Sequence, residues 1–185
     1  LHWWNDFGRT QWSNECHDLY VEISARKVVL TMSSVKPYLA QEIFIADDEP
    51  IYLGFLIDYL TSQNYQIKLT ETADDAISVA AANDYRAYVV ALNIPASNAL
   101  KATASKKDLE ESFPGISIAR AILTSGVSPR KVLIYSVHLT DALHAEIGRL
   151  GVEYVQKGRP RNIKDALNRV LSYDPKTSSA GGVAS

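Results

Sequence analysis

The chain has very little sulfur: among its 185 residues there is one cysteine, Cys16, and one methionine, Met32. A single cysteine excludes an internal disulfide and is typical of a reducing, cytoplasmic setting. Long apolar runs are missing too, because none approaches the roughly 20 residues that a membrane-spanning helix needs. The sequence therefore predicts a cytoplasmic protein that does not use a membrane as its partner.

The chain also has no large excess of charge, because it contains 19 basic and 21 acidic residues and its net charge is −2. Without a large basic field the domain has nothing to hold a nucleic-acid backbone, so we expect no nucleic-acid partner. Hydrophobic residues make up 46% of the chain and charged residues 22%, as in a globular protein with a substantial core. The length fits one domain with extensions better than two full domains.

From residue 42 onward, short strand-like runs alternate with segments of helical periodicity. The predicted buried strands are Ile43–Ala46, Gln66–Leu69, Ala87–Leu92, Val132–Tyr135 and Tyr154–Val155. The predicted helix starts lie near Pro50, Thr72, Ile116, Thr140 and Asn162. Five strands that alternate with five helices predict an α/β fold, a doubly wound parallel sheet with helices on both faces.

In such a fold the functional side chains gather at the carboxyl ends of the strands. Asp47 and Asp48 follow the first predicted strand, Ser136 ends the fourth and Lys157 follows the fifth. Two carboxylates, a hydroxyl and an ammonium at these ends form a specific set. They are the candidate site residues.

In type, order and spacing, over about residues 42–173, this set resembles the receiver domain of two-component response regulators. The resemblance implies a flavodoxin-like sheet of strand order 2-1-3-4-5 and a regulatory domain rather than an enzyme. In that family the paired acids hold Mg²⁺ and an Asp that ends the third strand accepts a phosphoryl group. The hydroxyl and the lysine bind the phosphoryl oxygens, and Tyr154 takes the place of the family's switch aromatic.

The acceptor acid is missing. In receivers a proline follows the acceptor by four residues, and counting back from Pro95 gives Ala91. A register shifted to Asn93 offers only an amide, which is no nucleophile for phosphoryl transfer. No carboxylate occurs between Asp84 and Asp108 to replace the acceptor. We therefore expect a pseudo-receiver with no catalytic residue.

Two smaller departures agree with this interpretation. The residue after the switch hydroxyl is normally small, and here it is Val137; the lysine is normally followed by proline, and here Gly158 follows it. Mg²⁺ prefers near-octahedral oxygen ligation, so Asp47 and Asp48 alone would hold it weakly and no cofactor is expected.

Each site residue has a plainer alternative. Asp47 and Asp48 either bind residual metal or cap the first helix, and Ser136 is either a pocket residue or an ordinary strand-end hydroxyl. Tyr154 is either a switch or a rim tyrosine that packs on the fourth helix. For Lys157 one hypothesis is a permanent ion pair with one of the two acids, which would mimic a locked state.

Three segments lie outside the receiver-like domain at 42–173. Residues 1–41 are rich in aromatic residues and contain a strand-like alternation, which predicts a strand or hairpin that packs on the domain or pairs with a partner. One hypothesis takes Met32 as the natural start and residues 1–31 as foreign to the domain. The insertion at 96–114 is either a lid or partner contact, or a tolerated mobile loop. Residues 174–185 are Gly/Ser-rich and predict a flexible tail.

The sequence as a whole predicts a phosphorylation-independent pseudo-receiver that acts as a protein–protein interaction module in signal transduction. Its partner would be another signalling protein or a second copy of itself, bound through the last strand and its flanking helices. The alternative is an atypical receiver that senses a small anion or metal in the residual acidic pocket. A flavodoxin-like enzyme would need a phosphate-binding glycine loop or a nucleophile–base pair, and the sequence offers neither.

Overall fold

The structure is a computed structural model, and it describes residues 36–103 and 107–173. The compact unit that contains them begins at Lys36. Most of the predicted N-terminal extension and the predicted tail lie outside the described residues, so the expectations for them stay predictions.

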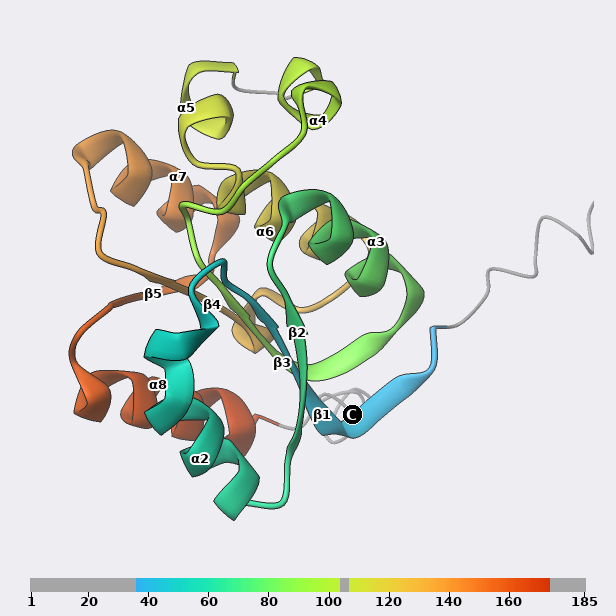
Figure 1. Cartoon of the computed structure of the whole chain (residues 1–185), viewed down its shortest axis with the longest axis vertical. Coiled ribbons are helices and arrows are strands. Elements are labelled where there is room, and N and C mark those ends of the chain that lie inside the picture. The colour runs from blue at the N-terminus through green and yellow to red at the C-terminus, as the bar shows by residue number, and fades with distance from the viewer. Residues whose placement is uncertain (1–35, 104–106, 174–185) are drawn as a thin grey trace, which may run out of the picture. The chain divides into compact units, whose positions relative to one another are not determined.

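Five parallel strands form one sheet in the order β2-β1-β3-β4-β5 (Figure 1), which confirms the predicted fold class and strand order. The strands are β1 (Tyr38–Ala46), β2 (Gln66–Thr70), β3 (Asp84–Val90), β4 (Val132–Ser136) and β5 (Glu153–Gln156). The chain adds β2 on one side of β1 and then β3 on the other. The strand order therefore reverses between β1 and β3, where such sheets open a crevice at their carboxyl ends.

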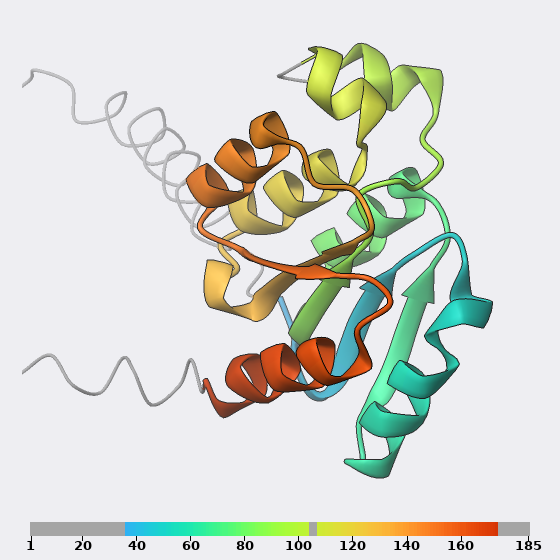
Figure 2. The same cartoon turned by 90° about the vertical axis from the view of Figure 1, so that its left-hand side faces the viewer.

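Helices cover both faces of the sheet, as Figures 1 and 2 show. The helix η1 (Pro50–Leu53), α2 (Gly54–Ser62) and α8 (Pro160–Ser172) pack on one face. The helices α3 (Ala73–Ala82), α6 (Gly115–Thr124) and α7 (Asp141–Leu150) pack on the other. A short helix η2 (Pro129–Lys131) leads into β4. No helix within 36–103 and 107–173 combines the length and the apolar character that crossing a bilayer would require.

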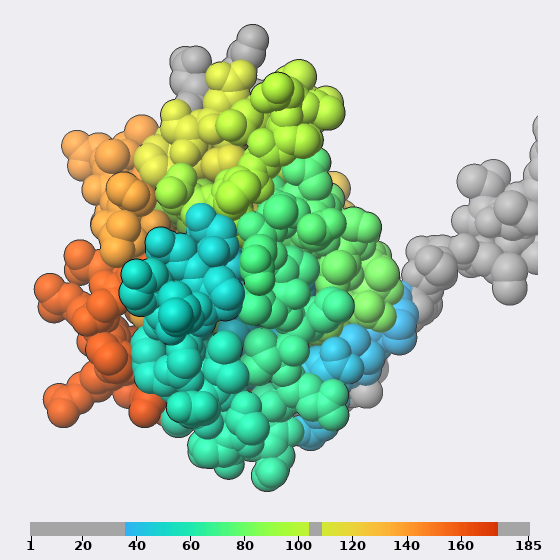
Figure 3. All heavy atoms as spheres, in the orientation of Figure 1, coloured from blue at the N-terminus to red at the C-terminus, as the bar shows by residue number. Residues whose placement is uncertain are grey.

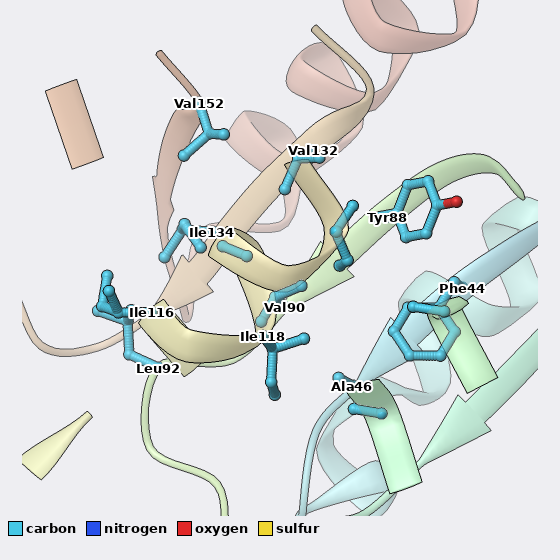
Figure 4. Packing of buried hydrophobic residues seen from close by; sticks show 14 of the residues in the cluster. Phe44, Ala46, Tyr88, Val90, Leu92, Ile116, Ile118, Val132, Ile134 and Val152 are labelled. Carbon is cyan, nitrogen blue, oxygen red and sulfur yellow. The ribbon is translucent and has the colours of Figure 1, made fainter. Parts of the chain in front are cut away.

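The strands read as continuous apolar runs because both of their faces are buried. Successive side chains on a strand point to opposite faces, so Phe44 and Ala46 join one core while Ile43 and Ile45 join the other. Figure 4 shows the first of these cores, where Phe44 lies near Tyr88 and the α6 residues approach the middle of the sheet. The two cores fix the sheet rigidly, and with it the edge at which the strands end.

Local sequence signals set most of the helix starts. Thr72 and Thr140 each accept a hydrogen bond from the backbone N–H three residues on, as predicted for helix caps. The last helix begins at Pro160, so the predicted start at Asn162 is wrong by two residues. Proline suits the first turn because its missing N–H would have no partner there.

β1 is longer than predicted. It begins at Tyr38, four residues before the expected domain start at residue 42, and Tyr38 and Leu39 pair with the first residues of β3. The register then shifts between Leu39 and Ile43. This irregular start hid the strand from a search for regular alternation.

Gly115 closes the insertion back onto the end of β3. Its N–H donates a hydrogen bond to the carbonyl of Leu92 at 3.0 Å. A Cβ at this position would lie 2.0 Å from the carbonyl oxygen of Ala91, closer than any contact allows. Only glycine lets α6 begin this close to the site residue Ala91.

Gly115→Ala is therefore expected to lower the free energy of unfolding by about 1–3 kcal/mol, because the backbone must shift to admit the methyl group. The matched control is Gly148→Ala on α7, where the added Cβ meets nothing within 4 Å and should stabilise by up to about 1 kcal/mol. Urea unfolding followed by circular dichroism measures both. Equal stability of the Gly115 variant and the wild type would contradict the close approach.

The buried tyrosines predict a pH dependence of stability. Burial raises the pKa of Tyr85, Tyr88, Tyr135 and Tyr154 above the ordinary value for a phenol. A raised pKa in the folded state means that the stability from these groups is fully present below the unfolded pKa of about 10. It is lost as the pH rises through the folded pKa values. We expect the free energy of unfolding to fall above about pH 10, with tyrosinate absorbance appearing together with unfolding; tyrosine ionisation without unfolding would contradict this.

Candidate functional site

The carboxyl ends of four strands meet at one edge of the sheet. Asp47 follows β1 and Lys157 follows β5, while Ser136 is the last residue of β4. Ala91 follows β3, and its N–H donates to the carbonyl of Ala46 at 2.8 Å. The backbone N–H of Lys157 donates to the carbonyl of Ser136 at 3.0 Å. These bonds continue the sheet ladder by one step and bring the predicted site residues together.

A cavity of about 180 Å³ opens at this edge. Its lining residues are Asp48, Glu49, Ala91, Asn93, Ser136, Val137, His138 and Lys157. The buried residue Ala91 thus lines the same cavity as Ser136 and Lys157. The sequence analysis did not select Glu49 or His138 as site residues. Glu49 follows the selected Asp48, and His138 lies two residues after the selected Ser136.

Lys157 forms an ion pair with Asp47. The distance from its Nζ to Asp47 Oδ2 is 2.6 Å, and the Asp47 side chain is only 2% exposed while that of Lys157 is 19% exposed. The other carboxylate oxygen of Asp47 accepts the N–H of Glu49 at 3.1 Å. Both oxygens of Asp47 and the lysine charge are therefore already engaged within the domain.

The residues present do not fit the Mg²⁺ ion that the receiver-like arrangement implies. Mg²⁺ favours near-octahedral oxygen ligation. Ala91 supplies no side-chain oxygen, and Asp47 is held by Lys157. Within the part of the chain that the structure describes, no three side chains of the His, Cys, Asp or Glu type converge as ligands. Residual metal binding by Asp47 and Asp48 stays a prediction.

Ser136 is buried, and its hydroxyl oxygen accepts the backbone N–H of His138 at 3.2 Å. This bond fixes the turn that leads from β4 toward α7. Val137, between the two, is 60% exposed. The serine thus shapes the loop and lines the cavity at the same time.

Tyr154 is held against the end of β4. Its hydroxyl donates to the carbonyl oxygen of Ser136 at 2.8 Å, and its ring packs against the core beneath α6 and α7. Burial raises the pKa of this phenol, which keeps it protonated and able to donate. This hydrogen bond holds the Tyr154 side chain of β5 against the end of β4.

The insertion forms two short helices, α4 (Asn98–Ala102) and α5 (Lys107–Ser112). Figure 3 shows it (yellow-green) at the surface, above the segment that follows β1 (cyan). Ser97 caps α4 and bonds to Asp74 of α3 through both its hydroxyl and its N–H, and these bonds lower the pKa of Asp74. None of the described residues in 96–114 lines the cavity. The described part of the insertion therefore adds no residue to the cavity wall, and the lid and loop alternatives stay predictions.

An ion-pair network with two buried carboxylates fastens the insertion, and no sequence pattern predicted it. Glu110 of α5 accepts bonds from Ser117 and Arg120 of α6, and Arg120 also pairs with Glu146 of α7 at 2.8 Å. Burial works against the charge on Arg120, but the bonds to Glu146 and Glu110 outweigh it and raise its pKa. Phe113 adds a ring contact to His138, with centroids 5.9 Å apart.

Comparison with solved structures gives receiver domains. A signal receiver domain from Vibrio parahaemolyticus superposes with a TM-score of 0.59 at 17% identity, covering 78% of this chain and 100% of that one. The non-phosphorylated HemR receiver domain from Leptospira biflexa gives 0.56 at 18% identity, covering 75% and 97%. The receiver domain of a sensor histidine kinase from Pseudomonas aeruginosa, solved with a magnesium ion in its active site cleft, gives 0.52 at 17%, covering 73% and 100%.

No family model matches the chain, and no curated protein matches it. At these identities the structural likeness establishes the fold alone. The described domain therefore has the receiver fold that the sequence pattern predicted.

The Lys157–Asp47 ion pair can be tested by a double-mutant cycle. Lys157→Met leaves the buried Asp47 carboxylate without a counter-charge, so we expect the free energy of unfolding to fall by about 3 kcal/mol. Adding Asp47→Asn to that variant should restore most of the loss. Urea unfolding of the four proteins gives the coupling energy.

The control is Arg169→Met, which removes the exposed pair with Glu153 and should cost less than about 1 kcal/mol. If Lys157→Met costs no more than this control, the pair does not stabilise the domain.

Proposed function

We propose that this domain is a pseudo-receiver, a protein–protein interaction module in signal transduction that works without phosphorylation. The observation that carries the proposal is that Ala91, which has no side-chain oxygen, lines the cavity at the carboxyl edge together with Lys157, which is paired with Asp47. The fold and the geometry of this edge support it.

Phosphoryl transfer to the domain needs an oxygen nucleophile at the end of β3. Ala91 has none, and the nearby Asn93 carries an amide. The Ser136 hydroxyl accepts the N–H of His138 in the turn after β4. Among the described residues, no carboxylate forms a hydrogen bond with this hydroxyl that would make it a general base. An acyl phosphate therefore has no carboxylate at the receiver acceptor position on which to form.

The same contacts argue for one fixed arrangement of the edge. The ammonium of Lys157 neutralises Asp47, and the phenol of Tyr154 is bonded to the carbonyl of Ser136. In a phosphorylated receiver the lysine would bind the phosphoryl oxygens. Here Lys157 binds Asp47 and Tyr154 binds the carbonyl of Ser136, so the module is expected to keep one binding-competent state.

The proposed partner surface consists of α7, β5 and α8. β5 is an edge strand of the sheet. The surface carries the ion pairs Arg149–Glu146 and Arg169–Glu153 and the exposed side chains of Arg159 and Arg161. Polar, charged surfaces of this kind suit a reversible complex with another signalling protein or with a second copy of the chain. We also propose that the protein works in the cytoplasm.

A second candidate function is an atypical receiver that senses a small anion or metal. The observation in its favour is the cavity itself, whose lining includes Ser136, Asn93 and Lys157 as groups that can bind oxygen atoms. The pairing of Lys157 with Asp47 weighs against it, because the charge that an anion would need is already used.

Titration with Mg²⁺ and beryllofluoride tests the proposed function. The wild type should give no saturable change in its amide spectrum, because neither a third metal ligand nor an acceptor carboxylate is present. Ala91→Asp should restore a saturable response at the strand ends, and Ala91→Asn, of the same shape but uncharged, should not. Saturable binding of the analogue to the wild type would overturn the proposal.

A further inference from the structure

Four large hydrophobic side chains in the described part of the chain are strongly exposed. They are Ile51 at 84%, Tyr52 at 70%, Val137 at 60% and Leu139 at 47%. Ile51 and Tyr52 lie on η1 in the segment after β1, and Val137 and Leu139 lie on the loop after β4, so both pairs follow strands that end at the carboxyl edge of the sheet. Apolar side chains that gather at one edge of a domain indicate a binding surface more than scattered ones do.

Backbone structure holds these side chains outward. Pro50 opens η1, and the N–H of Tyr52 donates to the carbonyl of Glu49 at 3.1 Å, so the short helix buries Leu53 and presents Ile51 and Tyr52 to solvent. The exposure is therefore built into the loop rather than caused by fraying.

The loop after β4 is fixed in the same way. Its start is tied by the bond from the His138 N–H to Ser136, and its end by the cap that Thr140 provides for α7. Val137 and Leu139 alternate with these anchoring residues and stay exposed. Val137 also lines the cavity, so the apolar surface reaches the cavity mouth.

The cavity between the two loops carries uncompensated negative charge. Asp48 and Glu49 line it, and neither is in an ion pair with any residue of 36–103 or 107–173. The one cation of the lining, Lys157, is neutralised by Asp47. A phosphate or carboxylate would meet two carboxylates there, whereas an ammonium or guanidinium would gain charge-assisted hydrogen bonds.

We propose that this edge docks a partner segment that inserts a lysine or arginine side chain into the cavity over Ala91. Apolar residues that flank the basic side chain would cover Ile51, Tyr52, Val137 and Leu139. This rests on the proposed function, because it names the class of partner for the interaction module. It adds a second binding surface, distinct from α7, β5 and α8, and uses the space that the acceptor carboxylate would occupy.

The test uses the ¹⁵N-labelled full chain and two synthetic amphipathic peptides with the same pattern of leucines. One carries arginine at the polar positions and the other carries glutamate. The arginine peptide should cause saturable shifts of the amides of Tyr52, Asn93 and His138, and the glutamate peptide should not. Equal binding of both peptides, shifts confined to another face, or no saturable shift would each overturn the proposed surface.

Variants locate the contact. Asp48→Asn and Val137→Ser change exposed or half-exposed side chains at the cavity, and each should raise the Kd for the arginine peptide about tenfold or more. The control is Asp58→Asn, which removes an equal charge from the exposed face of α2 and should leave the Kd within about twofold. If Asp58→Asn weakens binding as much as Asp48→Asn, the attraction is unspecific and the proposal fails.

The two proposals fail separately. If the arginine peptide does not bind and beryllofluoride still causes no change in the wild type, the proposed docking surface is wrong. Phosphorylation independence is then still supported. Saturable binding of beryllofluoride to the wild type would overturn the proposed function, whatever the result of the peptide titrations.

Discussion

The ion pair between Lys157 and Asp47 is the contact on which the carboxyl edge depends. β1 and β5 are not neighbours in the sheet, so the pair reaches across the ends of β3 and β4, where Ala91 and Ser136 lie. A carboxylate as deeply buried as Asp47 is costly unless a cation meets it. In the proposed function, Ala91 has no carboxylate that could compete with Asp47 for the lysine, which agrees with the observed pair.

In the proposed function, the Lys157–Asp47 ion pair holds the carboxyl edge in one arrangement without phosphoryl transfer. Tyr154 and Ser136 are tied to each other, and the loops after β1 and β4 are fixed by short hydrogen bonds and caps. The insertion is fastened to α6 and α7 through Glu110 and Arg120. In the proposed function, the edge would offer a partner its shape, exposed apolar side chains and negative charge.

The fold was predictable because its signals are local or periodic. Strands buried on both faces read as apolar runs, and Thr72 and Thr140 cap helices through bonds within one turn. The position of Ala91 followed from its distance to Pro95. The irregular start of β1 at Tyr38 lacked such a signal, because a register shift interrupts the alternation.

The finer contacts at the site could not be read from the sequence. Asp47 and Asp48 are chemically identical neighbours, and only the three-dimensional path of the chain decides that Asp47 is buried against Lys157 while Asp48 faces the cavity. The network of Glu110, Arg120 and Glu146 joins three helices, and Arg120 and Glu146 are 26 residues apart in the sequence. Its members carry no motif, because their pairing depends on how the insertion packs.

We expect that an edge with Ala91 at the acceptor position carries no acyl phosphate. Incubation of the full chain with acetyl phosphate and Mg²⁺, followed by intact-mass measurement before and after hydroxylamine, tests this expectation. The expected result is an unchanged mass throughout. A phosphoryl adduct that hydroxylamine removes would contradict it, because such an adduct requires the carboxylate nucleophile that Ala91 lacks.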